Sequence, residues 1–224
     1  DRNGSILATN LITNALYAKP RMMINRNFAA GELAKIFPEL KFEKLLKLLG
    51  SDRNFVWIKR KISPEQMQAV HELGEPGLRF GPREMRLYPN GRLASHVLGG
   101  VNFGKEGVNS AELVGIAGVE LKFDQFLQDN LGKGIPLILS LDLGIQSAIE
   151  QVLSGGMRLM NAKGATAVLM DIYSGEIISM VSLPDFDPND RTISGKGKKG
   201  SENPLFNKSV QGLYELGSVF KVFT

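Results

Sequence analysis

A glycine-containing segment at residues 131–136 divides this 224-residue chain into two parts with different hydrophobic patterns. Closely spaced glycines are typical of a loop between folded parts. The first part has short apolar runs separated by turns, whereas the second begins with an apolar run at residues 135–141. We therefore predict two domains, residues 1–133 and residues 134–224.

The composition is that of an ordinary globular protein, with 43% apolar and 22% charged residues. This balance excludes a disordered tail, a coiled coil and a collagen. The 27 Lys and Arg residues and 23 Asp and Glu residues give a formal net charge of +4, which is too small to indicate a nucleic-acid partner. The chain has no Cys, and His71 and His96 are too far apart for a short metal motif, so we expect both to be surface or capping residues.

No apolar run is long enough to span a bilayer, which takes roughly 18–20 residues. The most apolar window, residues 135–145, is interrupted by Ser140 and Asp142. The chain also begins without Met and without the charged and apolar regions of a secretory signal. We therefore expect both ends to be boundaries within a longer protein, in which a membrane anchor can lie upstream.

Alternating patterns and turn residues predict the elements of the first part. An Asn-Gly turn at residues 3–4 precedes an expected strand at residues 5–8 and an extended stretch at residues 11–23. Ser63, followed by Pro64, has the pattern of a helix N-cap. The other expected elements are strands at residues 55–58 and 78–88 and helices at residues 29–37, 42–49, 63–73, 92–98 and 121–128.

The second part is predicted to contain a buried strand, a long helix and a hairpin. Asp142 is the expected N-cap of the helix, and Gly155 is the point where we expect an interruption. Residues 191–202 are rich in Lys and Gly without the spacing of a phosphate-binding loop, so we expect a mobile loop that trypsin cuts first. In chain order, the expected elements are a strand at residues 135–141, a helix at residues 143–160, hairpin strands at residues 165–172 and 176–182, and the first turns of a helix at residues 214–224.

Ser218 and Lys221 form the candidate catalytic pair. Residues three apart on a helix share a face, so the amine can reach the hydroxyl and accept its proton as the oxygen attacks a carbonyl. With 15 Ser and 16 Lys in 224 residues, however, chance alone predicts about one Ser-x-x-Lys motif. The motif by itself does not distinguish a catalytic pair from a capping Ser and a solvated Lys.

Five segments, in order, resemble the class B penicillin-binding proteins. Residues 214–221 are Tyr-Glu-Leu-Gly-Ser-Val-Phe-Lys, where that family typically has Tyr-Glu-Pro-Gly-Ser-Thr-Phe-Lys. Residues 139–142, Leu-Ser-Leu-Asp, and the segment after them resemble the start of the family's transpeptidase domain. Three motifs resemble its pedestal domain: Asp-Arg-Asn-Gly at residues 1–4, Arg-Leu-Tyr-Pro-Asn-Gly at residues 86–91 and Gly-Ile-Ala-Gly-Val-Glu at residues 115–120.

The chain departs from the family pattern at a few positions. Leu216 replaces the usual Pro and Val219 replaces the common Thr, but neither side chain performs chemistry. The short connection at residues 131–138 and the Glu-Leu-Gly-Ser sequence resemble the division-specific septal subgroup of alphaproteobacterial type. The family's Lys-Thr-Gly motif does not occur in these residues, so we expect the 224 residues alone to react poorly with β-lactams.

The resemblance implies an α+β fold, with an elongated N-terminal pedestal of the dimerisation type over residues 1–133. Residues 134–224 would form the truncated start of a penicilloyl-serine transferase domain, an antiparallel sheet sandwiched by helices. The implied enzyme is a periplasmic serine-type D,D-transpeptidase of septal cell-wall synthesis, anchored in the inner membrane by an upstream helix. Ser218 would attack the penultimate D-Ala of a peptidoglycan stem with Lys221 as its base. No metal or organic cofactor is implied.

The resemblance also implies partners and a structural site. The partners are peptidoglycan stem peptides, β-lactam antibiotics, and division-complex proteins that include a membrane glycosyltransferase, but no nucleic acid. Arg2, Arg86 and Glu120 would form a charge-paired knot that joins the pedestal to itself and to the transpeptidase domain; the alternative is three independent surface charges. A side-wall transpeptidase and a non-catalytic docking module remain open, whereas the pedestal motifs disfavour a β-lactamase or a β-lactam sensor.

Overall fold

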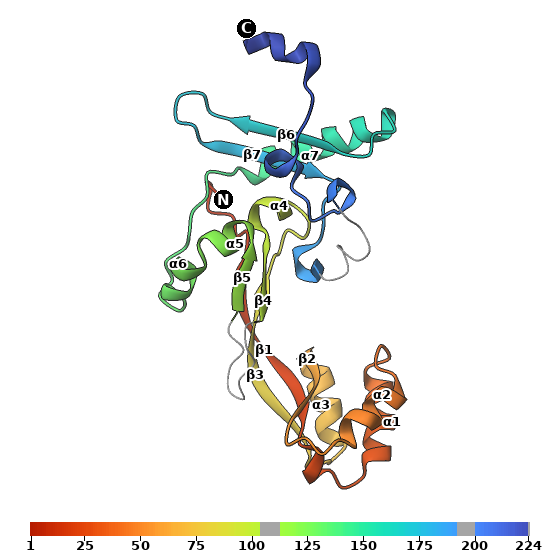
Figure 1. The fold of residues 1–224 in the computed structure, drawn as a ribbon. Helices are drawn as coiled ribbons and strands as arrows, with labels where there is room; N and C mark the ends of the chain where they lie inside the picture. The colour runs from red at the N-terminus through yellow and green to blue at the C-terminus, as the bar shows by residue number, and fades with distance from the viewer. Residues whose placement is uncertain (104–112, 192–199, 224) are drawn as a thin grey trace. The chain divides into compact units, whose positions relative to one another are not determined.

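The computed structural model describes residues 1–103, 113–191 and 200–223, and it contains two compact units (Figure 1). The small unit is formed by Asn10–Met85. The large unit combines Asp1–Thr9 with the described parts of Arg86–Gly104 and Glu112–Thr224. The domain boundary expected after residue 133 lies within the large unit and stays a prediction.

A sheet of three strands organises the small unit. Strand β1 (Thr9–Ala18) lies between β2 (Val56–Ile62) and β3 (Leu78–Leu87), and it pairs antiparallel with β2 with Tyr17 opposite Trp57. The helices of this unit are α1 (Arg26–Ile36), α2 (Phe42–Leu49) and α3 (Pro64–Glu72), with a short 3₁₀ helix, η1 (Pro20–Met22).

The helices of the small unit bury their apolar faces against the sheet. Leu33 and Phe37, at the end of α1, are fully buried together with Leu45 of α2 and Leu16 of β1. Helix α3 begins at a complete capping box, because Ser63 Oγ accepts a hydrogen bond from the Gln66 N–H and Gln66 Oε1 accepts one from the Ser63 N–H. The N-cap expected from Ser63 is therefore confirmed.

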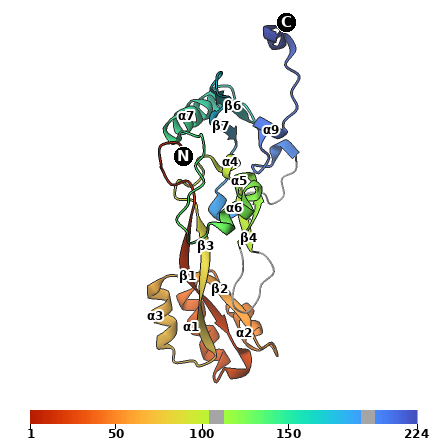
Figure 2. The ribbon, with the colours of Figure 1, turned by 90° about the vertical axis from the view of Figure 1, so that its left-hand side faces the viewer.

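The large unit is assembled from segments that are far apart in the sequence (Figure 2). Strand β4 (Gly100–Phe103) pairs antiparallel with β5 (Leu113–Ala117), and β6 (Ala165–Met170) pairs antiparallel with β7 (Ile177–Leu183). The helical elements are α4 (Ser95–Leu98), α5 (Gly118–Lys122), α6 (Asp124–Asp129), α7 (Leu143–Leu159), η2 (Pro188–Asp190), η3 (Gly200–Glu202), α9 (Lys208–Gln211) and η4 (Gly217–Phe223).

Gln146 joins α7 to the side of β7 that does not pair with β6. Its Oε1 accepts hydrogen bonds from Ser179 Oγ at 2.8 Å and from the Met180 N–H at 2.9 Å, while its Nε2 donates to the Met180 carbonyl at 2.9 Å. Gln146 and Ser179 are both buried. The amide thus pairs with the strand as a neighbouring strand would, and it satisfies polar groups that would otherwise be buried without partners.

Several expectations from the sequence are wrong, each for a local reason. Residues 5–8 form no strand, because the Asp1 carboxylate accepts the Ser5 N–H and closes a loop. Residues 135–141 also form no strand; isolated contacts, such as Ser140 Oγ to the Ile177 carbonyl, replace a ladder. The long helix continues through Gly155.

Other expectations are confirmed or lie outside the described residues. The helix at residues 42–49, the hairpin, and the helix that starts after Asp142 are confirmed. His71 is exposed, but His96 is buried, and its Nε2 lies 2.7 Å from the Pro204 carbonyl. Most of the loop at residues 191–202 is outside the described residues. Within the described ranges, no helix is long and apolar enough to cross a membrane, and no cluster of acidic or imidazole side chains could hold a metal ion.

We predict that Gln146→Ala lowers the free energy of unfolding by about 3 kcal/mol, because it leaves the Ser179 hydroxyl and both Met180 backbone groups without partners and opens a cavity. Urea denaturation followed by circular dichroism measures this change. Gln151→Ala is the matched control, since Gln151 is an exposed glutamine on the same helix. Equal losses in the two variants would contradict the role given to Gln146.

Candidate functional site

Ser218 and Lys221 lie together on η4. This 3₁₀ helix begins at Gly217, whose positive φ of 57° is accessible to glycine at little cost. In a 3₁₀ helix, side chains three residues apart eclipse each other, so the two side chains share a face. Both residues are exposed. The sequence predicted the start of an apolar helix here, whereas the structure has a 3₁₀ helix that contains the exposed Phe220 and follows the exposed Leu216.

The segment before η4 is anchored to β7 through α9. The Lys208 N–H donates to Ser182 Oγ at 2.9 Å, and the Tyr214 hydroxyl donates to the Lys208 carbonyl at 3.1 Å. Asn207 caps α9, since its Oδ1 accepts from the Ser209 N–H. The side chain of Lys208 is buried, and this burial lowers the pKa of its amine. The chain is thus fixed a few residues before the candidate catalytic pair.

Arg86 and Glu120 form a shielded ion pair, with 2.8 Å between Arg86 Nε and Glu120 Oε1. The Glu120 side chain is 5% exposed and that of Arg86 is 15% exposed. Two glycines bring the backbone close enough to place Glu120. A Cβ on Gly118, whose φ is +61°, would lie 2.6 Å from the Val97 carbonyl oxygen, and one on Gly115 would lie 2.1 Å from the Glu120 carbonyl oxygen.

Tyr88 lies in the same motif as Arg86 and is also buried. Burial, and then the negative charge of Glu120, raise the pKa of the Tyr88 hydroxyl, which keeps it neutral. The Tyr88 N–H donates to Asn189 Oδ1, and Asn189 Nδ2 donates back to the Tyr88 carbonyl, both at 3.0 Å. This reciprocal pair joins the Tyr-Pro turn to η2, so a side-chain amide binds the backbone of the motif in addition to the ion pair at Arg86.

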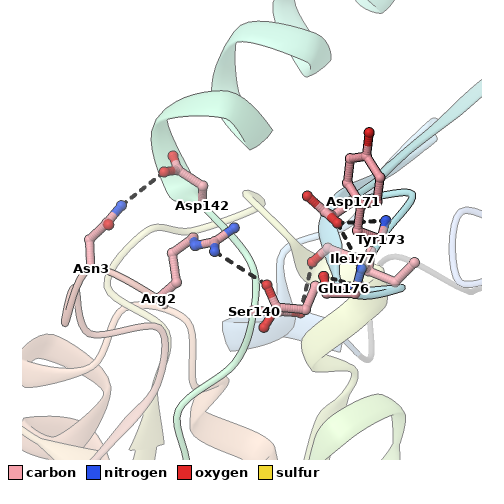
Figure 3. A network of polar contacts seen from close by, with 9 residues as sticks. Arg2, Asn3, Ser140, Asp142, Asp171, Tyr173, Glu176 and Ile177 are labelled. Carbon is pink, nitrogen blue, oxygen red and sulfur yellow. Dashed lines mark hydrogen bonds and ion pairs between the residues drawn. The ribbon is translucent and has the colours of Figure 1, made fainter.

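Arg2 lies with the hairpin turn between β6 and β7 (Figure 3). Arg2 Nη2 is 3.3 Å from Glu176 Oε2. The backbone N–H of Arg2 donates to the Leu141 carbonyl at 2.8 Å. Both side chains of this ion pair are considerably exposed, at 38% for Arg2 and 49% for Glu176. The Asp171 carboxylate accepts the Tyr173 N–H and shapes the turn.

The structure therefore brings together two members of the predicted knot. Arg86 and Glu120 are in contact, whereas the ion pair of Arg2 is with Glu176. The prediction assumed that charges from three similar motifs converge on one carboxylate. It did not consider Glu176, because this residue was assigned only to the start of the second hairpin strand, residues 176–182.

Sequence reasoning also missed Asp1 and Asn3. The Asp1 carboxylate accepts the Asn3 N–H at 2.9 Å through Oδ1 and the Leu143 N–H at 3.2 Å through Oδ2. Asn3 Nδ2 donates to Asp142 Oδ2 at 2.9 Å, while Asp142 Oδ1 accepts the Ile145 N–H. The hydrogen bond from Ile145 first, and that from Asn3 next, lower the pKa of Asp142. The carboxylates of Asp1 and Asp142 thus cap α7. The sequence signal that could have revealed this cap is the presence of both Asp1 and Asn3 in the turn at the start of the chain.

We predict unequal losses from removing the two carboxylates that bind arginine. Glu120→Ala should lower the free energy of unfolding by roughly 2–4 kcal/mol, since it disrupts a shielded, hydrogen-bonded ion pair. The control Glu176→Ala should lower it by less than about 1 kcal/mol, because its ion pair is exposed to water. Urea denaturation at low and high salt measures both. Similar losses in the two variants would show that shielding does not decide the strength of these pairs.

Comparison with known proteins identifies the family. Residues 1–135 match the penicillin-binding protein dimerisation domain, and residues 165–224 match the penicillin-binding protein transpeptidase domain. The chain belongs to the penicillin-binding proteins. The resemblance and the α+β fold class expected from the sequence are thereby confirmed.

Individual relatives of this penicillin-binding protein chain agree. It is 33% identical over 226 residues to a probable peptidoglycan D,D-transpeptidase FtsI of Caulobacter vibrioides, covering 100% of this chain and 36% of that protein. It is 30% identical to a probable peptidoglycan D,D-transpeptidase PenA of Neisseria gonorrhoeae, covering 100% of this chain and 41% of that protein. Among solved structures, it is similar to a penicillin-binding protein (PBP2) from Helicobacter pylori in complex with MreC, with a TM-score of 0.70, 25% identity, and coverage of 99% of this chain and 48% of that one. The chain thus spans less than half the length of each of these relatives.

Proposed function

We propose that the protein is a serine-type peptidoglycan D,D-transpeptidase that forms an acyl-serine intermediate. The supporting observation is that this penicillin-binding protein chain carries Ser218 and Lys221 on one face of η4, within the part that matches the transpeptidase domain. Relatives that match the chain along its whole length are named as D,D-transpeptidases. The Ser-x-x-Lys motif alone could arise by chance, so the family match is what supports a catalytic role for it.

In the proposed reaction, the Ser218 oxygen attacks the carbonyl carbon of the penultimate D-Ala of a stem peptide. The neutral amine of Lys221 accepts the hydroxyl proton and then donates it to the nitrogen of the leaving D-Ala. Backbone N–H groups, one of them that of Ser218, stabilise the oxyanion. The amine of a second stem peptide then attacks the acyl-enzyme, which forms the cross-link and frees Ser218. A β-lactam acylates the same oxygen.

Several finer features belong to the same proposal. The relatives named FtsI support a role in septal wall synthesis, with the protein held at the periplasmic face of the inner membrane by a helix upstream of these residues. Division-complex proteins, including a membrane glycosyltransferase, are the proposed partners. Residues 1–133 would act as the pedestal and residues 134–224 as the start of the transpeptidase domain. The Arg86–Glu120 ion pair would stabilise the pedestal motifs.

We predict that penicillin slowly acylates Ser218 of this chain and forms a covalent adduct there. The expected slowness follows from the missing Lys-Thr-Gly sequence, which in the family binds the substrate carboxylate, and from the exposure of Lys221, which keeps its amine in water. Intact-mass analysis and peptide mapping after long incubation with a fluorescent penicillin measure the adduct.

Ser218→Ala should abolish the adduct, and Lys221→Ala should slow its formation further. Ser209→Ala is the matched control, since Ser209 is a nearby serine outside the motif. An adduct that persists in Ser218→Ala, or that maps to another residue, would exclude Ser218 as the nucleophile.

A non-catalytic docking role is the second candidate. It is supported by the similar PBP2 of Helicobacter pylori, whose solved structure is a complex with MreC. On this proposal the pedestal residues bind a protein of the cell-wall machinery, and a side-wall rather than septal role follows. A pull-down with MreC, using the chain and its Ser218→Ala variant, tests it. Binding that is unaffected by Ser218→Ala would support docking independent of catalysis, and absence of binding would contradict this candidate.

A further inference from the structure

Asn3 and Asn90 are the two asparagines of the chain that directly precede glycine. Both side chains are exposed. In an Asn-Gly sequence, the backbone nitrogen of the glycine can attack the side-chain amide carbon of the asparagine, because glycine has no Cβ to hinder the approach. Asparagine is accordingly one of the thermolabile residues of proteins. The two turns are therefore candidate sites of a spontaneous covalent modification.

The turn at Asn3 leaves room for this reaction. Gly4 has a φ of +86°, and a Cβ built on it would meet no heavy atom within 4 Å beyond its own neighbours in the chain. The Gly4 N–H donates to the Asp1 carbonyl at 3.2 Å, which is at the long end of backbone hydrogen bonds. The attacking nitrogen thus lies in open space and is held by a long hydrogen bond.

The Asn3 amide is held by the residue that caps α7 (Figure 3). Its Nδ2 donates to Asp142 Oδ2 at 2.9 Å, and Asp142 Oδ1 accepts the Ile145 N–H at 3.0 Å. Attack by the Gly4 nitrogen expels Nδ2, so the hydrogen bond to Asp142 must break. The closed contact therefore protects Asn3, and the reaction proceeds from conformations in which the first residues have moved away from α7.

The reaction needs only water as a second reactant. The Gly4 nitrogen forms a bond to the Cγ of Asn3 and loses its proton, while the Cγ–Nδ2 bond breaks and ammonia leaves. Water then attacks one of the two carbonyl carbons of the resulting succinimide ring and breaks the carbon–nitrogen bond there. The product is an aspartate or an isoaspartate at position 3, and neither the loss of ammonia nor the new linkage reverses by itself.

The product cannot restore the contact with α7. Its ionised carboxylate only accepts hydrogen bonds, and it would face Asp142, which also only accepts. Asp1 brings a third carboxylate to the same place, since its Oδ2 accepts a backbone N–H at the start of α7. The partial positive charge of a helix start is about half a unit, so it does not balance three neighbouring negative charges. The nearby Arg2 is already paired with Glu176.

We propose that Asn3 is a deamidation site, at which a transient opening of the first residues is converted into their permanent release from α7. The proposal is independent of the catalytic role of Ser218, because Asn3, Asp142 and the start of α7 carry it alone. The open conformation exposes the amide to attack, and the product disfavours closing.

Asn90 provides an internal comparison within the same unit. Its Nδ2 donates to the Ile6 carbonyl at 2.8 Å, and the Gly91 N–H donates to the Tyr88 carbonyl at 3.1 Å. Like Gly4, Gly91 has a positive φ and open space around a Cβ position. The amide of Asn90 is held by a neutral carbonyl, so a change at Asp142 should alter the reaction at Asn3 and leave that at Asn90 nearly unchanged.

The first test measures deamidation at both sites by peptide mapping of the chain after incubation in mildly alkaline buffer. Asp142→Ser keeps a helix-capping oxygen but is too short to reach Asn3. The reaction at Asn3, read as a gain of about 1 Da with an isoaspartate fraction, should be about fivefold faster in Asp142→Ser than in the wild-type chain, because a hydrogen bond of ordinary strength no longer holds the amide. The rate at Asn90 should change by less than about twofold.

Two results of this test overturn the proposal. One is equal acceleration at Asn3 and Asn90 in Asp142→Ser, which would reflect a general loss of structure. The other is an absence of reaction at Asn3 in the native chain when the urea-unfolded chain has been fully converted at that residue. Asn3→Gln is the control for the assignment, since it keeps an amide donor, and its mass at position 3 should not change over the same time.

The second test measures the consequence for α7 by hydrogen–deuterium exchange. Asn3→Asp supplies one product as a single species, and Asn161→Asp adds the same charge at an exposed asparagine beyond the other end of α7. Exchange of the Leu143 and Ile145 N–H groups should be about fivefold faster or more in Asn3→Asp and unchanged in Asn161→Asp. Unchanged exchange in Asn3→Asp, or an equal increase in the control, overturns the proposal.

Partly deamidated wild-type chain keeps the second test decisive if Asn3→Asp does not fold. The fraction of molecules with fast exchange at the start of α7 should equal the fraction deamidated at Asn3 in the same sample. A single slow-exchanging population in such a sample contradicts the release of the first residues.

Discussion

The hydrogen bonds from Asp1 and Asn3 to the start of α7 connect residues 139 or more positions apart, and the arrangement of the large unit depends on them. The Asp1 carboxylate accepts the Leu143 N–H, and Asn3 donates to the Asp142 carboxylate, which accepts the Ile145 N–H, so carboxylates occupy the end of the helix that presents unpaired N–H groups. The same few residues direct Arg2 to the hairpin turn and close the loop at Ser5. Together with the bond from the Arg2 backbone N–H to the Leu141 carbonyl, these contacts hold the first residues of the chain beside α7 and the β6–β7 hairpin.

Burial separates the charge pairs of this penicillin-binding protein chain into two kinds. The Arg86–Glu120 pair is shielded and is supported by the close backbone approach at Gly115 and Gly118. The Arg2–Glu176 pair is open to water, where Coulomb attraction is weak and salt screens it. Shielded pairs specify how segments fit together, whereas exposed pairs mainly follow an arrangement that backbone contacts have already determined.

Periodic segments bounded by clear turn residues could be predicted from the sequence, and solitary contacts could not. Helix α2 matches its expected bounds because its apolar spacing ends at Gly50. The run at residues 135–141 was interpreted as a strand because apolar composition does not reveal whether its polar groups bond to a ladder or to single partners. The partners of Arg2 and Gln146 depend on three-dimensional placement, since no spacing rule connects residues so distant in sequence.

The candidate catalytic pair illustrates the same limit. Ser218 and Lys221 were found because a short-range spacing carries their chemistry, and the family match now gives that spacing a context. Their role remains a proposal, since catalysis also depends on the groups that bind substrate and stabilise charge. The hydrogen bonds of Lys208 and Tyr214 anchor the chain before the pair. These bonds could not be predicted from the sequence, because they depend on how the chain folds.

The side-chain contacts along β7 have a consequence for sheet growth. Ser140, Asp142 and Gln146 occupy backbone groups of Ile177, Ile178 and Met180 through a hydroxyl, an N–H and an amide. A strand from another molecule could not pair with β7 there without displacing these bonds. The covered edge therefore protects this stretch from edge-to-edge aggregation, a hazard that natural sheets commonly reduce with charges or bulges. Here a helix N-terminus and its preceding turn provide the protection.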